Sequence, residues 1–246
     1  ERKLLEQFRS AKGKQAPQAL AHTSSHDYTD RQFKALNCIA CHDRDETPSL
    51  LASLHSQSQP LMQGVPVDDR NKVDQSRPQL TYIGEMLHTN YIEKMLNGTA
   101  GDRPRPWLAM RMPAFHSRAK LMAQGLSRQH GMPPSAPKFD KIDTEKSTVG
   151  KKLVGSNGGF ACNICHADGD TKATAAFEVE GINFDQVARR LRPGYYHRWM
   201  ENPQSITPTT KMPRYTQNNK SPLPDYNNDA QKQFDAILEY FRSLEK

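Results

Sequence analysis

The chain has 246 residues, of which only 35% are hydrophobic while 25% are charged. This is a small apolar inventory for one large domain, and smaller still for two domains of roughly 100 to 120 residues, because small domains bury less of their surface. Aromatic residues and apolar residues at helical spacing nevertheless exclude full disorder. We therefore expect something other than side chains to fill part of the core.

The net charge is +7 and the pI is near 9.2. The basic residues are scattered rather than gathered in a stripe, so we predict no binding to nucleic acid. No apolar run approaches the roughly 20 residues that span a bilayer, and we expect a soluble chain with no membrane span. The chain begins at Glu1 without a signal-like segment. We interpret it as a processed protein or part of a longer one, with residues 1–23 as a basic amphipathic extension or connector.

The four cysteines form two pairs, Cys-Ile-Ala-Cys-His at residues 38–42 and Cys-Asn-Ile-Cys-His at residues 162–166. Cys-x-x-Cys-His is the signature of covalent attachment of haem c. Two thiols at this spacing can both form thioethers with the vinyl groups of one porphyrin, and the adjacent histidine then lies beneath the iron as an axial ligand. We predict two haem c groups. The thioether positions are Cys38, Cys41, Cys162 and Cys165, and the axial histidines are His42 and His166.

Other roles for the cysteines fit the spacing less well. A four-cysteine zinc site places its pairs about 15 to 20 residues apart, much closer than these pairs. A thioredoxin-like redox pair needs a βαβ context, whereas the flanks here indicate short helices and polar loops. A disulfide that closes Cys-x-x-Cys is a strained ring that stabilises little.

Each haem motif is followed by a Met-Pro pair in a shared pattern of basic residue, Met, Pro, any residue and aromatic residue. The pattern reads Arg-Met-Pro-Ala-Phe at residues 111–115 and Lys-Met-Pro-Arg-Tyr at residues 211–215. Proline favours an extended conformation at the preceding residue, and a methionine in such a loop can reach an iron with its soft thioether. We predict Met112 and Met212 as the second axial ligands.

The first site has competing ligands, namely Met110, Met132, His55, His88 and His116. Met132 is followed by three prolines and a polar linker, so no closing helix is expected after it. Four further residues are candidates for contacting haem propionates, because basic groups and amphipathic rings suit a buried carboxylate. These are Arg111, Tyr195, Trp199 and Lys211.

An internal repeat organises the chain. Placing Leu87 on Leu191 pairs Tyr91 with Tyr195 and Met95 with Trp199, and a four-residue insertion in the first copy then brings the two Met-Pro loops together. Each copy is expected to contain an N-terminal helix, the haem motif, a polar loop, a middle helix, the methionine loop and a closing helix. Residues 43–78 form an unusually long polar loop, and residues 132–143 read as the linker.

The expected N-terminal helices span residues 29–36 and 145–154. The first closing helix is expected over residues 117–129, with Ser117 as its N-cap and Gly131 as its stop. The last helix carries an apolar stripe that we expect to pack on the N-terminal helix of its own domain. That stripe consists of Phe234, Ile237, Leu238, Phe241 and Leu244.

The two copies resemble class I cytochrome c domains, and together, from about residue 24 to 246, they are similar to dihaem cytochromes c and to cytochrome modules of bacterial dehydrogenases and oxidases. The stretch from residue 191 to 213 carries much of this likeness. The resemblance implies an all-α fold of two cytochrome c-like domains, at residues 24–139 and 140–246. Each would be a small helical bundle around one covalent haem c, with long irregular loops. It also implies haem attachment outside the cytoplasm, hence a periplasmic or exported protein.

The leading hypothesis for function is single-electron transfer between redox partners through two His/Met haems, without substrate chemistry in this chain. The partner would be a redox protein, or a dehydrogenase or oxidase that is fused to the chain or associated with it. The alternative is a dihaem enzyme of the peroxidase type, which requires one haem open to substrate. The two Met-Pro loops favour the electron carrier.

Overall fold

The computed structural model describes residues 18–58, 77–101, 103–135, 138–176 and 180–245, together with the single residues 6 and 10. Regular structure in these ranges is helical throughout, and the only pairings of strand type in them are isolated bridges. The all-α prediction is confirmed for this part of the chain. None of its helices is both long and apolar enough to cross a membrane.

The chain divides into two compact units. The first consists of residues 1–101 and 110–136, and the second of residues 102–109 and 137–246. The change from one unit to the other at residue 136 falls inside the predicted linker at residues 132–143. The short segment 102–109 is grouped with the second unit although it lies within the sequence of the first.

The first unit contains five α-helices and one 3-10 turn among its described residues. They are α2 (Gln18–Ala35), η1 (Cys38–Ala40), α3 (Leu50–Ser58), α4 (Ile83–Met86), α5 (Thr89–Asn97) and α6 (Ala119–Gln129). Two features differ from the expectation. Helix α2 begins well before residue 29 and takes in part of the predicted connector, and α3 lies in the segment predicted as an irregular loop. Residues 59–76 of that loop lie outside the described residues.

The second unit contains four α-helices and four 3-10 turns in its described part. They are α7 (Thr144–Val154), η4 (Cys162–Ile164), η5 (Phe184–Gln186), α8 (Val187–Arg190), α9 (Pro193–Glu201), η6 (Pro203–Ser205), η7 (Asp225–Asn228) and α10 (Ala230–Ser243). Helix α7 matches its prediction and begins at Asp143, whose carboxylate accepts hydrogen bonds from two backbone N–H groups of the first turn.

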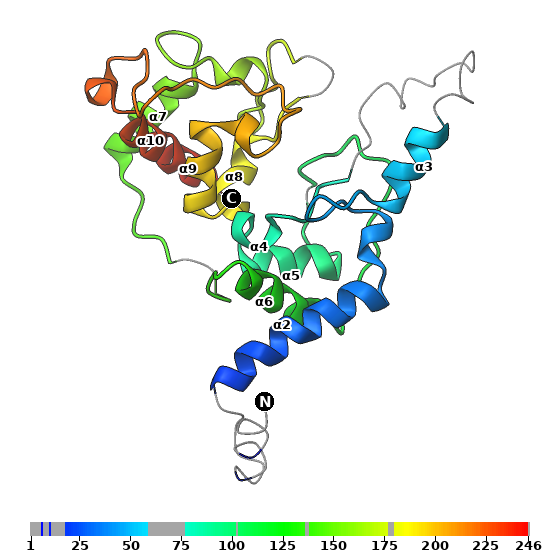
Figure 1. Ribbon diagram of the computed structural model, residues 1–246. Coiled ribbons are helices and arrows are strands. Elements are labelled where there is room, and N and C mark those ends of the chain that lie inside the picture. Colours follow the sequence, from blue (N-terminus) through cyan, green and yellow to red (C-terminus); the bar gives the residue numbers. More distant parts are fainter. Residues whose placement is uncertain are drawn as a thin grey trace. The chain divides into compact units, whose positions relative to one another are not determined.

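In both units the first described helix packs against the last, α2 on α6 and α7 on α10 (Figure 1). Each crossing is so close that one position must be glycine. A Cβ atom on Gly125 of α6 would lie 1.9 Å from Oγ1 of Thr29, and one on Gly150 of α7 would lie 2.0 Å from the carbonyl oxygen of Ala236. The backbones can therefore approach only where no side chain intervenes.

The predicted stripe of α10 forms the core of the second unit. Phe234 and Ile237 are fully buried, Leu238 and Phe241 are buried, and Leu244 is partly buried. The expectation that this stripe packs on α7 is confirmed. At the first closing helix, Gly131 adopts a left-handed conformation just beyond the helix, as expected of a stop. The N-cap prediction for Ser117 is wrong, because α6 begins one residue later, with Arg118 at the N-cap position.

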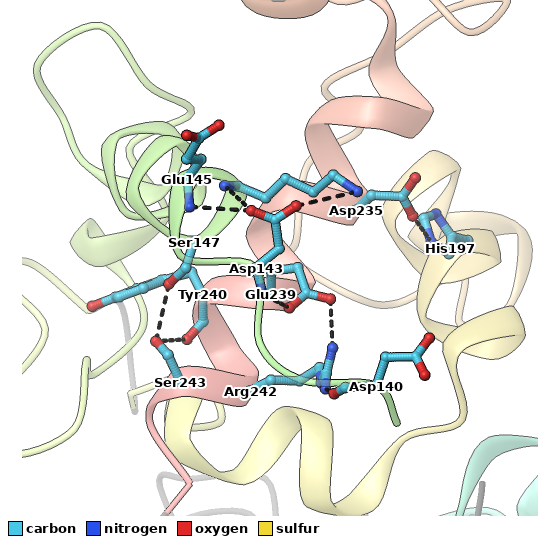
Figure 2. Close-up of polar contacts among 11 residues, drawn as sticks. Asp140, Asp143, Glu145, Ser147, His197, Asp235, Glu239, Tyr240, Arg242 and Ser243 are labelled. Carbon is cyan, nitrogen blue, oxygen red and sulfur yellow. Dashed lines mark hydrogen bonds and ion pairs between the residues drawn. The ribbon is translucent and has the colours of Figure 1, made fainter. Parts of the chain in front are cut away.

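Polar contacts join the ends of α7 and α10 (Figure 2). The backbone N–H of Asp143 donates to Glu239, and the hydroxyl of Ser147 donates to that of Ser243 at 3.2 Å. Arg242 pairs with Glu239 and also donates to the carbonyl oxygen of Asp140. These contacts fix the register of the two helices whose apolar faces make the core.

The internal repeat appears in the helices themselves. Helices α4 and α8 each have four residues, and α5 and α9 each have nine. Both pairs are offset by 104 residues, since 187 minus 83 and 193 minus 89 both equal 104. The offset equals that of Leu87 and Leu191, so Met95 and Trp199 are both the seventh residue of their helix. The alignment proposed from the sequence is confirmed over these elements.

Candidate functional site

The two Cys-x-x-Cys-His motifs have the same backbone conformation. Each forms a 3-10 turn that starts at its first cysteine. In each, the N–H of the second cysteine and the N–H of the histidine donate to the carbonyl oxygen of the first cysteine, at 3.2 and 3.0 Å. The turn brings both cysteines and the histidine of each motif into one short segment. Two sequences that share only their cysteines and histidine therefore take one local fold.

A left-handed residue precedes each motif. Asn37 has φ 51° and ψ 48°, and Ala161 has φ 58° and ψ 35°. Asparagine adopts this conformation readily, whereas for alanine it costs about 1–2 kcal/mol. The same left-handed conformation at the residue before both motifs indicates a functional constraint on the backbone at that position.

The two axial-ligand candidates are oriented alike. Nδ1 of His42 lies 2.7 Å from the carbonyl oxygen of Pro78, and Nδ1 of His166 lies 2.8 Å from that of Ile182. A carbonyl oxygen only accepts hydrogen bonds, so each Nδ1 carries the proton and donates it. The other ring nitrogen, Nε2, then keeps its lone pair. This is the tautomer and orientation of a histidine prepared to ligate a metal.

Burial keeps both histidines neutral. Burial lowers the pKa of His42 and of His166 from the ordinary value of 6.5. The hydrogen bonds to Pro78 and Ile182 raise these two pKa values, but the effect of burial is larger. The guanidinium of Arg77 lowers the pKa of His42 further. A neutral imidazole is the form that binds iron.

Gly181 and Phe184 confine the His166 ring. The ring stacks on Phe184, with 5.4 Å between centroids, and Phe184 in turn stacks on Phe241 of α10. A Cβ atom on Gly181 would lie 2.4 Å from Cε1 and 2.5 Å from Nδ1 of His166. The ring therefore occupies space that only a glycine leaves open.

All four cysteines are free thiols, as covalent attachment of haem requires. Burial raises the pKa of Cys162 to about 12, and it also raises that of Cys38. Two apolar side chains inside the motifs, Ile39 and Ile164, are 45% and 38% exposed. Exposed apolar groups beside thiols and neutral imidazoles are the lining that a porphyrin would cover, so the residues present fit haem c.

In the second unit the methionine loop packs against the core that contains the first cysteine of the motif. Met212 is half-buried against the core that contains Cys162, and Tyr215 packs on Phe160 with 5.2 Å between ring centroids. Burial, with a smaller contribution from the nearby Cys162, raises the pKa of Tyr215 to about 12. The indole N–H of Trp199 donates to Sδ of Met212 at 2.9 Å. The structure thus brings Met212 and Cys162 to one core.

In the first unit the methionine loop is more open. Met112 is 39% exposed and Met110 is 50% exposed. The guanidinium of Arg77 donates to Sδ of Met110 at 3.1 Å, and the same guanidinium acts on His42. Met110, rather than Met112, accepts this hydrogen bond from Arg77.

The remaining candidates are placed as follows. His88 is buried at the start of α5, whereas His55 and His116 are exposed. Met132 is held by the end of α6, where its N–H donates to the carbonyl of Ser127. Of the propionate candidates, Arg111 and Lys211 are exposed. Tyr195 is buried and stacks on Trp199 with 6.4 Å between ring centroids, and the indole N–H of Trp199 donates to Met212.

Sequence reasoning missed Pro78, Ile182, Gly181 and Arg77. The first two supply backbone carbonyls, which no side-chain motif can reveal. Pro78 and Ile182 are 104 residues apart, as are Arg77 and Gly181, so each pair occupies equivalent positions of the repeat. Extending the alignment backward from Leu87 and Leu191 pairs these positions, but their residue types differ and do not mark them.

Two further findings bear on what the site is. Among the described residues, no group of three or more histidine, cysteine or acidic side chains is arranged to hold a metal ion. No family model, curated protein or solved structure matches this chain. The chemistry of the site therefore rests on its own geometry.

Proposed function

We propose that this chain is a dihaem c-type cytochrome, periplasmic or otherwise exported, that transfers single electrons between redox partners. It acts as a free carrier or as the electron-transfer module of a dehydrogenase or oxidase. The observation that carries the proposal is the pair of matching motifs, in which His42 and His166 each anchor Nδ1 on a backbone carbonyl and keep Nε2 available. One such histidine could be coincidental, but two in the same turn beside two thiols favour haem attachment.

Each bound haem would supply an iron that changes oxidation state by one electron. The chain would hold it by thioethers at Cys38 and Cys41 in the first unit, and at Cys162 and Cys165 in the second. His42 and His166 would ligate one face of the irons, and Met112 and Met212 the other. Such closed coordination favours electron transfer and excludes other ligands.

The test is the number of haems attached per chain. The protein would be exported in a host that attaches haem c, then analysed by its pyridine haemochrome spectrum and by mass spectrometry after denaturation. We expect two covalent haems in the unaltered chain. Replacing both cysteines of either motif by serine should leave one. A chain that carries no covalent haem would refute the proposal.

The exposure of Met112 favours one second candidate, an enzyme of the peroxidase type whose first haem is open to substrate. Binding of carbon monoxide by the reduced protein separates the two functions. If both sulfurs ligate, neither haem should react, and the ferric protein should show a far-red sulfur-to-iron band of two-haem intensity. Rapid reaction of one haem would favour the enzyme.

A further inference from the structure

The hydrogen bond between Trp199 and Met212 distinguishes the second unit from the first. Nε1 of Trp199 lies 2.9 Å from Sδ of Met212, and both side chains pack against the core that includes Cys162. Indole N–H is a donor only, and a thioether sulfur accepts weakly. The contact therefore fixes which way the sulfur points, because rotation of the methionine side chain would break it.

No equivalent of this bond is seen among the described residues of the first unit. Trp199 is the seventh residue of α9, and the seventh residue of the matching helix α5 is Met95, whose side chain has no N–H group. Sδ of Met110 receives a hydrogen bond from Arg77 instead, and Met112 is exposed. The two methionine loops share a sequence pattern but differ in what holds the sulfur.

We propose that Trp199 is a positioning residue for the Met212 sulfur, and that it makes the two haems unequal by raising the reduction potential of the one in the second unit. This inference rests on the proposed function. A thioether sulfur has two lone pairs, so one can accept from Trp199 while the other faces the iron. A hydrogen bond to the sulfur withdraws electron density from it, and hydrogen bonds to axial ligands are a recognised means of setting potential.

The sign follows from charge. Ferric iron carries one more positive charge than ferrous iron and gains more from an electron-rich ligand. A donor that draws density from the sulfur therefore destabilises the ferric state more than the ferrous state, which raises the potential. This contribution therefore favours the transfer of an electron from the first haem to the second.

The test is a redox titration of the holoprotein and of the Trp199→Phe variant, which keeps an aromatic ring but loses the N–H. The Met212→His variant identifies the wave of the second unit, because histidine lowers the potential. Met95→Phe is the matched control at the equivalent helical position. It places the same ring there without removing an N–H, and should leave the wave of the second unit unchanged.

We expect Trp199→Phe to lower the reduction potential of the haem in the second unit. At a fixed potential, the ratio of ferrous to ferric iron in that haem should fall roughly two- to tenfold, which corresponds to the free energy of one hydrogen bond. Imidazole should also displace the sulfur faster in this variant. If Trp199 only fills space, the variant loses thermal stability but keeps the wave in place, which overturns the inference. If the unaltered protein shows no sulfur-to-iron band, methionine is not a ligand and the inference fails, whereas the proposed function itself fails only if the chain carries no covalent haem.

Discussion

The contact between Gly181 and the His166 ring permits a sharp test of how the site is built. In a Gly181→Ala variant the new Cβ would lie 2.4 Å from Cε1 of His166, whereas ordinary contacts begin near 3.4 Å. The ring would have to move by about 1 Å. Its hydrogen bond to the carbonyl of Ile182, now 2.8 Å, would then stretch beyond hydrogen-bonding distance.

Two costs follow from that displacement. The lost hydrogen bond is worth about 0.5–1.5 kcal/mol, and overpacking typically costs about 1–3 kcal/mol. We therefore expect Gly181→Ala to lower the free energy of unfolding by about 2–3 kcal/mol, measured by urea denaturation. If the protein carries the proposed haem, its visible spectrum should also change, because His166 would be displaced from the orientation in which Nε2 can ligate.

Gly194→Ala is the matched control. Gly194 lies in α9, and no heavy atom lies within 4 Å of the position its Cβ would take. Alanine there should stabilise the helix by up to about 1 kcal/mol. A Gly181→Ala variant that unfolds at the same urea concentration as the unaltered protein, with the same spectrum, would refute the reasoning.

Three further predictions concern the second unit. Gly150→Ala should lower the free energy of unfolding by about 3 kcal/mol in urea denaturation, because its Cβ would lie 2.0 Å from a backbone oxygen of α10. A smaller decrease than that of Gly181→Ala would contradict the close crossing of α7 and α10. Tyr196→Phe should lower the free energy of unfolding by about 1 kcal/mol in the same assay, because the buried hydroxyl of Tyr196 donates a hydrogen bond to the carbonyl oxygen of Phe234 at 3.0 Å. A variant as stable as the unaltered protein would contradict that hydrogen bond. Burial raises the pKa of Tyr215 from 10 to about 12, so the contribution of this residue to the free energy of unfolding should be fully present below pH 10 and should be lost as pH rises toward 12. Tyr215→Phe should weaken this pH dependence of the urea midpoint. The same pH dependence in the variant and in the unaltered protein would contradict the prediction.

Much of the local structure could be predicted because it depends on near neighbours. The helix expected over residues 145–154 matches α7, and the apolar spacing from Phe234 to Leu244 predicts the buried face of α10. Helix α3 was missed because residues 50–58 show no buried stripe, and without burial the periodicity of a helix carries no signal.

The candidate site was predictable where chemistry depends on spacing. The cysteines and histidines at 38–42 and 162–166 could be singled out by their spacing alone, and the structure gives both motifs one conformation. The carbonyls of Pro78 and Ile182, by contrast, lie 36 and 16 residues beyond the histidines they bind. Backbone groups are the same in every residue, so no residue type marks them.

By itself the sequence determined the helical class, the repeat and the two Cys-x-x-Cys-His motifs, since each depends on residue type and short-range spacing. Only the tertiary structure decided which carbonyl holds each histidine, that a glycine must face His166, and that Trp199 donates to Met212 while Met112 is exposed. Those contacts join residues brought together by the packing of helices, and packing depends on the shapes of all the partners at once.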